Sequence, residues 1–79
     1  MIEPTQCRAA RALLGWTQAD LSSATGLSGV TIREFENGRD MRASNQTLLR
    51  LTFEKAGVTF IDSNGGGPGV RLSAPPDKT

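Results

Sequence analysis

Residues 17–38, TQADLSSATGLSGVTIREFENG, constrain the fold most because they hold two short helix signals separated by one glycine. Thr17 can cap the first helix, with an acidic residue three positions later completing a capping box. Gly26 can end that helix because glycine adopts the left-handed conformation at little cost. Ser28 can cap the second helix, which the letters E-N-G close. Two helices joined by such a tight turn predict a helix-turn-helix unit, whose second helix is suited to a DNA major groove.

Helical and β-type patterns continue on both sides of this unit. Pro4 suits a first helical position, and VTFID and GVRLS are short β-type runs that predict a hairpin. The predicted fold class is mainly α: a four-helix helix-turn-helix domain at residues 1–57, a C-terminal β-hairpin at 58–72 and a disordered tail at 73–79. The helices are expected at residues 4–14, 18–25, 29–37 and, capped by Ser44 or Asn45, up to Ala56.

The composition restricts the chemistry open to the chain. One cysteine and no histidine among 79 residues exclude an internal disulfide and histidine-based catalytic or zinc sites. We expect Cys7 to be a small buried hydrophobe. No apolar run approaches the roughly 18 residues of a membrane span, and no signal-peptide pattern is present. We therefore expect a cytoplasmic protein without a cofactor, metal or evident small-molecule ligand. The net charge is only +1, so any DNA binding would depend on placed contacts.

Residues 17–38 resemble the Cro and lambda-type repressor family, also called the xenobiotic-response-element family. The resemblance covers about residues 6–57, and the matching positions are Gln18, Leu21, Ser22, Gly26, Leu27, Ile32, Phe35 and the E-N-G ending. Thr25 departs from the aliphatic residue usual in the family. The resemblance implies a short bacterial regulator of the kind that phages and mobile elements often encode. It also implies that Ser28, Gly29, Val30 and Glu34 face base edges.

A helical wheel of residues 29–37, drawn without reference to the family, places an overlapping set of residues on the outward face. Two large apolar residues define the buried side, and the opposite side carries Val30, Arg33, Glu34 and Asn37. Arg33 can contact guanine O6 and N7, Glu34 can accept from cytosine N4, and Val30 can pack on a thymine methyl. The alternative is that Arg33 and Glu34 simply lie solvated on a helix surface.

Four further residues are predicted to contact DNA phosphates. Gln18 opens the first helix of the unit, where main-chain N–H groups and the helix dipole favour a phosphate. By resemblance it binds the DNA backbone and braces the second helix. Asn37, Arg39 and Arg42 follow the second helix and are the other predicted phosphate contacts. Ordinary surface solvation is the alternative for the two arginines.

Glu36 is not assigned to DNA, because a carboxylate that faces phosphates would repel them. Its place on the flank of the helix and the family pattern indicate a partly buried ion pair with Arg11. Such a pair would fix the packing of the first helix of the chain on the recognition helix and add little net stability.

Apolar surface at the C-terminal end predicts a homodimer. The last helix is apolar on more than one face, and a lone two-stranded hairpin is marginal in water. Two-fold pairing would place two recognition helices one helical turn of DNA apart on an inverted repeat. The side chains expected to form this dimerisation surface are Leu49, Phe53, Val58, Phe60, Ile61 and Leu72. For the hairpin residues among them, contact with the last helix of the same chain is the alternative.

The sequence therefore predicts a sequence-specific binder of double-stranded DNA that is not an enzyme. The leading hypothesis is a dimeric repressor on an inverted-repeat operator, and the resemblance implies control of its own promoter. The alternative is a protein-interaction module, such as an antitoxin or anti-activator, that uses the same fold to hold a partner protein. Catalysis is the weakest hypothesis, because paired carboxylates, a nucleophile with a base and a phosphate-binding loop are all missing from the sequence.

Overall fold

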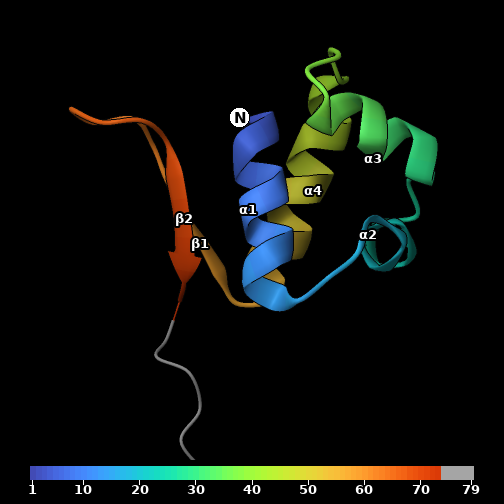
Figure 1. The fold of residues 1–79 in the computed structure, drawn as a ribbon, viewed down its shortest axis with the longest axis horizontal. Helices are drawn as coiled ribbons and strands as arrows, with labels where there is room; N and C mark the ends of the chain where they lie inside the picture. Colours follow the sequence, from blue (N-terminus) through green and yellow to red (C-terminus); the bar gives the residue numbers. More distant parts are fainter. Residues whose placement is uncertain (74–79) are drawn as a thin grey trace, which may run out of the picture.

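The computed structural model describes residues 1–73, which form four helices and one two-stranded antiparallel sheet (Figure 1). The elements are α1 (Pro4–Leu14), α2 (Gln18–Thr25), α3 (Gly29–Glu36), α4 (Ala43–Lys55), β1 (Val58–Ile61) and β2 (Gly69–Leu72). The mainly α fold class, with a helix-turn-helix unit and a C-terminal hairpin, is confirmed. Of the tail expected to be disordered, residues 74–79 lie outside the described residues.

The helix-turn-helix unit is fixed by the capping residues that the sequence indicates. The Thr17 hydroxyl accepts the Asp20 main-chain N–H at 3.0 Å, and the Asp20 carboxylate accepts the Thr17 N–H at 2.9 Å. Gly26 ends α2 at φ +82°, a conformation that residues with side chains rarely adopt. The Ser28 hydroxyl then accepts the Thr31 N–H at 3.0 Å and starts α3.

The recognition helix ends one residue earlier than expected. Its last residue is Glu36, and Asn37 follows as the C-cap. The Asn37 N–H still donates to the Arg33 carbonyl at 3.0 Å, but Gly38 turns the chain away at φ +100°. Asn37 therefore lies exposed at the very end of α3.

The last helix begins earlier than expected. α4 starts at Ala43, so the expected caps Ser44 and Asn45 lie inside its first turn. A different side chain fixes this turn: Gln46 Nε2 reaches back and donates to the Met41 carbonyl at 2.8 Å. The expected cap is corrected: Arg42 stands at the N-cap position of α4, no side chain accepts the free N–H groups there, and the Gln46 bond instead ties the preceding loop to the helix.

One apolar core joins the helices to the hairpin. Trp16 stacks on Phe53 with ring centroids 5.9 Å apart, and the Phe60 ring is tilted against Phe53 with centroids 6.1 Å apart. β1 packs against α4 and β2 against α1. The hairpin thus covers one side of α1 and α4, whereas α2 and α3 lie on the other side (Figure 1). The largest fully buried side chains are Phe53, Leu21, Ile32, Leu49, Val58 and Cys7.

One polar side chain of α1 is buried against the hairpin. The Gln6 amide nitrogen donates to the carbonyl of Ile61 at 3.3 Å and to that of Gly69 at 3.0 Å. Ile61 and Gly69 face each other across the two strands at the loop end. The Gln6 amide oxygen accepts the Glu3 N–H at 2.9 Å, which completes a capping box at the start of α1. A single glutamine therefore fixes the start of a helix and joins both strands to it.

Most side chains expected on a dimer surface lie inside the chain. Leu49 and Phe53 have no exposed area, Val58 is 1% exposed and Phe60 is 8% exposed. The assignment of Leu49 and Phe53 to a dimer surface is corrected, because the core of the same chain covers them. For Val58 and Phe60 the structure shows the other expected contact, that of the hairpin with α4.

A different set of apolar side chains remains on the surface. Of the expected set, Ile61 is 39% exposed and Leu72 is half-buried. The second stripe of α4 is also uncovered, with Leu48 37% exposed and Leu51 53% exposed. Periodicity indicates two apolar stripes on α4, but it does not tell which of them the hairpin covers.

Candidate nucleic-acid interface

The recognition helix α3 presents a mixed polar and apolar face to solvent. Val30 is 51% exposed, and Arg33 and Glu34 are also exposed. On the opposite side, Ile32 has no exposed area and Phe35 is 4% exposed. The structure thus places the three candidate base-reading side chains on one outward face, as the helical wheel indicates.

The first two candidate positions of α3 differ from the others. The Ser28 hydroxyl accepts the Thr31 N–H and donates to Thr31 Oγ1 at 2.9 Å, so its proton is committed to the cap. Gly29 is half-buried, and a Cβ added there would meet no atom within 4 Å. Packing within the chain therefore does not require a glycine at this position. Close approach of an external molecule to the backbone would require one.

Below this face, the carboxylate of Glu36 joins α1, α2 and α3. Arg11 donates to both carboxylate oxygens at 2.8 Å, through Nε and Nη2. Gln18 Nε2 donates to Oε1 at 3.0 Å, and Cys7 Sγ donates to Oε2 at 3.1 Å. The Glu36 side chain is 2% exposed and the Arg11 side chain 18%. The structure thus brings the two expected ion-pair residues together, and two further donors with them.

The hydrogen bonds of this cluster set its protonation state. Burial alone raises the pKa of Glu36, but the hydrogen bonds from Arg11, Gln18 and Cys7 outweigh burial and hold that pKa below its ordinary value. The hydrogen bond to Glu36 also raises the pKa of Arg11. Burial, and then Glu36, raise the pKa of the Cys7 thiol. Near neutral pH the cluster therefore holds a carboxylate, a guanidinium and a neutral thiol that donates its proton.

One member of the cluster has the bracing role that the resemblance implies, and another carries more than the sequence indicates. Gln18 is the first residue of α2, and its amide braces the end of α3 through Glu36. Cys7 is buried, as expected of a small hydrophobe, but its thiol also donates a hydrogen bond. Cys7 and Arg11 lie four residues apart on α1, so they share one face of the helix. That spacing is the sequence signal that could have revealed the thiol as a partner of Glu36.

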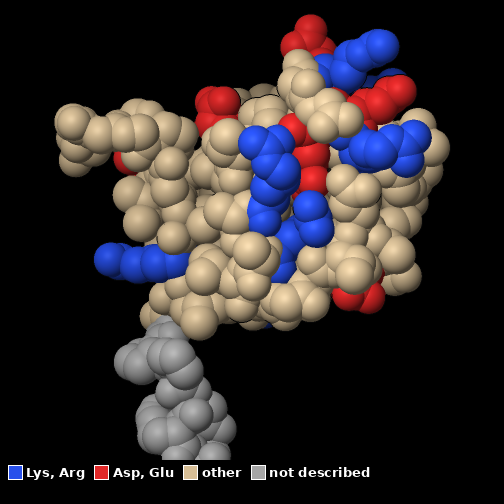
Figure 2. All heavy atoms as spheres, viewed as in Figure 1, with Lys and Arg blue, Asp and Glu red and all other residues tan. Residues whose placement is uncertain are grey.

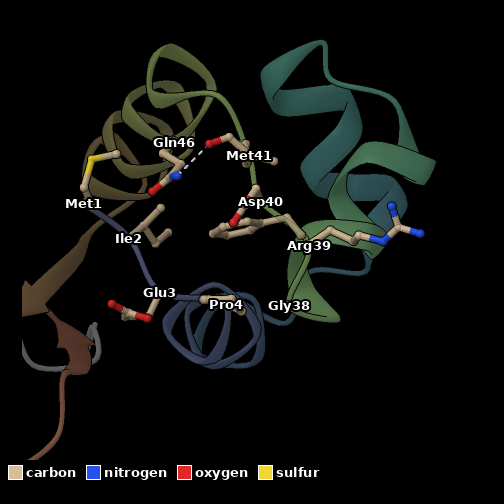
Figure 3. A pocket seen from close by; sticks show the side chains of 10 residues that line it. Met1, Ile2, Glu3, Pro4, Gly38, Arg39, Asp40, Met41 and Gln46 are labelled. Carbon is tan, nitrogen blue, oxygen red and sulfur yellow. Dashed lines mark hydrogen bonds between the residues drawn. The ribbon is translucent and has the colours of Figure 1, made fainter.

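The loop after α3 carries the other candidate phosphate contacts. Arg39 and Arg42 are exposed, and the Arg39 N–H donates to the Glu34 carbonyl at 2.9 Å. A pocket of about 380 Å³ lies between this loop and the start of α1 (Figure 3). Figure 3 shows the Arg39 side chain extending away from the pocket, while the Gln46 amide holds the loop at Met41. The loop is therefore anchored, and the Arg39 guanidinium points outward.

Positive side chains gather on the same side of the molecule as α3. Figure 2 shows Lys and Arg side chains over α1, over α3 and at the loop that follows α3, with acidic side chains between them. Among residues 1–73, Arg33, Arg39 and Arg42 have no acidic group within ion-pair distance. These three guanidinium groups are therefore available to an anionic partner.

Comparison with known proteins agrees with this geometry. A model of the helix-turn-helix family matches residues 8–52, which run from α1 into α4 and make up more than half of the chain. No curated protein sequence matches the chain significantly. Among the helices of residues 1–73, none has the length and apolar character that a membrane crossing requires.

Proposed function

The chain belongs to the Cro/C1-type helix-turn-helix family of DNA-binding transcription regulators, and we propose that it is a homodimeric repressor of the cytoplasm. Its target would be an inverted-repeat operator in double-stranded DNA. One observation carries the proposal: α3 buries Ile32 and Phe35 and leaves Val30, Arg33 and Glu34 exposed on one face. Exposed side chains of this kind at the recognition helix can read base edges in a major groove.

Each exposed side chain of α3 has a defined partner in this proposal. Arg33 donates two hydrogen bonds to a guanine, Glu34 accepts from a cytosine amino group, and Val30 packs on a thymine methyl. Gly29 lets the backbone approach the groove floor. Ser28 contributes through its remaining acceptor lone pair, because its proton is already donated to Thr31.

The proposed phosphate contacts gather near the C-terminal end of α3. Gln18 stands at the N-terminus of α2 and has one N–H left after its bond to Glu36. Asn37, Arg39 and Arg42 follow the C-terminal end of α3 and are exposed. These four residues would hold the DNA backbone beside this end of the helix and so fix the register of α3.

Dimerisation would use the apolar side chains that the fold leaves uncovered. Leu48 and Leu51 lie on the free stripe of α4, and Ile61 and Leu72 lie on the hairpin. A second copy is the proposed occupant because one α3 carries too few base contacts for strong discrimination. Two copies related by a two-fold axis would double that number on an inverted repeat.

Selection of bound sites from a random duplex library tests the whole proposal. We expect the purified chain to enrich an inverted repeat whose half-site centres lie about 10 base pairs apart. Light scattering on the enriched duplex should show two chains per site. A bound duplex without two-fold symmetry would overturn the dimer, and no enrichment from any library would favour the protein-interaction alternative.

A further inference from the structure

We propose that Arg8 is a further DNA phosphate contact, which the end of α3 holds in place. This inference deepens the proposed function and rests on it. Arg8 belongs to α1, outside the helix-turn-helix unit, and no spacing in the sequence singles it out. The structure does so, because the Arg8 guanidinium reaches the last residue of the recognition helix.

The position of Arg8 is fixed by the main chain of α3. Arg8 Nη1 donates to the main-chain carbonyl of Glu36, the last residue of α3. The last four carbonyls of a helix have no partner within the helix, and a cation near them is favoured by the helix dipole. Arg8 therefore has a preferred place at this helix end, although its side chain is largely in solvent.

The charge at this place is not neutralised by the protein. Arg11 is paired with the Glu36 carboxylate, so these two charges compensate each other. Arg8 has no acidic group within 4.0 Å among residues 1–73. The cluster of Arg8, Arg11 and Glu36 thus keeps one positive charge, and the remaining N–H groups of Arg8 are free to donate to a phosphate.

Arg8 also lies beside residues already proposed to hold the DNA backbone. Glu36 binds Gln18 through its side chain and Arg8 through its carbonyl, and Asn37 follows directly in the chain. Figure 2 shows positive side chains over α1 and over α3 on one face of the molecule. A DNA backbone that passes the C-terminal end of α3 would therefore meet Arg8.

Arg71 provides a matched control. It is an exposed arginine of β2, also without an acidic group within 4.0 Å among the described residues. The hairpin lies on the side of α1 that faces away from α3 (Figure 1). Removing the Arg71 charge changes the net charge of the protein by the same amount as removing that of Arg8, but at a distance from the proposed interface.

Salt dependence separates a phosphate contact from a purely structural helix cap. The probe is a 30-base-pair duplex of mixed sequence, and the full chain is titrated by fluorescence anisotropy over a series of NaCl concentrations. We expect Arg8→Met to lower the slope of log affinity against log salt by about 0.9. Arg8→Lys, which keeps the charge, should retain the parent slope, and so should Arg71→Met.

Each other outcome has a defined meaning. A parent slope in Arg8→Met, accompanied by a lower melting temperature, would show a helix cap only and overturn the inference. Equal reductions in Arg8→Met and Arg71→Met would overturn it too, because they would reflect net charge alone. If Arg8→Met does not fold, Arg8→Gln gives the same comparison, since glutamine is neutral and can still donate to the carbonyl. Failure of the parent chain to bind any duplex would instead refute the proposed function itself.

Discussion

The junction of α1, α2 and α3 and the junction of α4 with the hairpin are both buried, but different forces hold them. At the first, the carboxylate of Glu36 accepts hydrogen bonds from three side chains. At the second, the Phe53 ring packs against two other aromatic rings, with centroids 5.9 and 6.1 Å away. Apolar burial stabilises without direction, whereas hydrogen bonds to a carboxylate require defined geometry. The comparison indicates that the apolar junction supplies stability and the polar junction orients the recognition helix.

The strongest test of the apolar junction is Phe53→Ala. Phe53 has no exposed area, so its truncation should lower the free energy of unfolding by about 3–5 kcal/mol. Urea unfolding measures this loss, and Thr47→Ala, at an exposed position of α4, should stay within about 0.5 kcal/mol of the parent. The folded fraction of Phe53→Ala should bind the selected operator with parent affinity. Loss of that affinity would break the division of roles between the two junctions.

The polar junction is tested by removing one partner of its ion pair. Arg11→Met leaves the Glu36 carboxylate buried and poorly paired, which should lower the free energy of unfolding by about 3 kcal/mol. The double variant with Glu36→Leu should recover much of that stability in the same urea experiment. Its operator affinity should stay low, because Gln18 has lost the acceptor that braces α3. An unchanged melting temperature in Arg11→Met would mean that the pair is effectively in solvent.

The buried thiol gives the polar junction a dependence on alkaline pH. Burial and the neighbouring Glu36 raise the pKa of Cys7 in the folded chain, whereas a free thiol titrates near 8.5. Above that pH the unfolded chain loses a proton that the folded chain keeps, so stability falls by about 1.4 kcal/mol per pH unit. Urea unfolding at pH 7.5 and 9.5 measures the loss. In Cys7→Ser the part of this stability loss that the thiol causes should disappear. An equal loss of stability in both proteins would mean that other residues cause it.

The smallest expected effect concerns the face that the polar junction orients. Gly29→Ala should raise the free energy of unfolding by about 0.4–1 kcal/mol, because the added methyl meets open space and the unfolded chain loses freedom. The same methyl should weaken operator binding by on the order of 1 kcal/mol, the size of one disturbed base pair. Thermal unfolding and operator titration read out the two changes. If Gly29→Ala binds the operator as tightly as the parent chain does, Gly29 is not part of the DNA interface.

Much of the fold could be predicted because its signals are local. Thr17, Gly26 and Ser28 fix the helix-turn-helix unit through hydrogen bonds and dihedral angles that span a few residues. The outward face of α3 follows from the 3.6-residue period. The ion pair of Arg11 with Glu36 follows from the place of Glu36 on the flank of the helix together with the family pattern.

The unpredicted features depend on contacts between distant residues. Gln6 lies 55 and 63 positions from the carbonyls that it binds, and the Cys7 thiol lies 29 positions from Glu36. No periodicity reveals such pairs. The sequence also does not reveal which of the two apolar stripes of α4 is buried, because that depends on where the hairpin packs.

The hydrogen bonds of Gln6 have a consequence for how the hairpin opens. The loop end of the two strands is held by Gln6, and the other end is closed by the Ser73 N–H, which donates to the Gly57 carbonyl at 2.7 Å. A free hairpin frays from its ends, but here the loop end is tied to α1 and the other end is closed by a main-chain hydrogen bond. The amide hydrogens of the strands should therefore exchange with deuterium only as fast as the whole domain unfolds. We therefore expect the C-terminal strands and the N-terminal helix to unfold as a single cooperative unit, although they lie at opposite ends of the described chain.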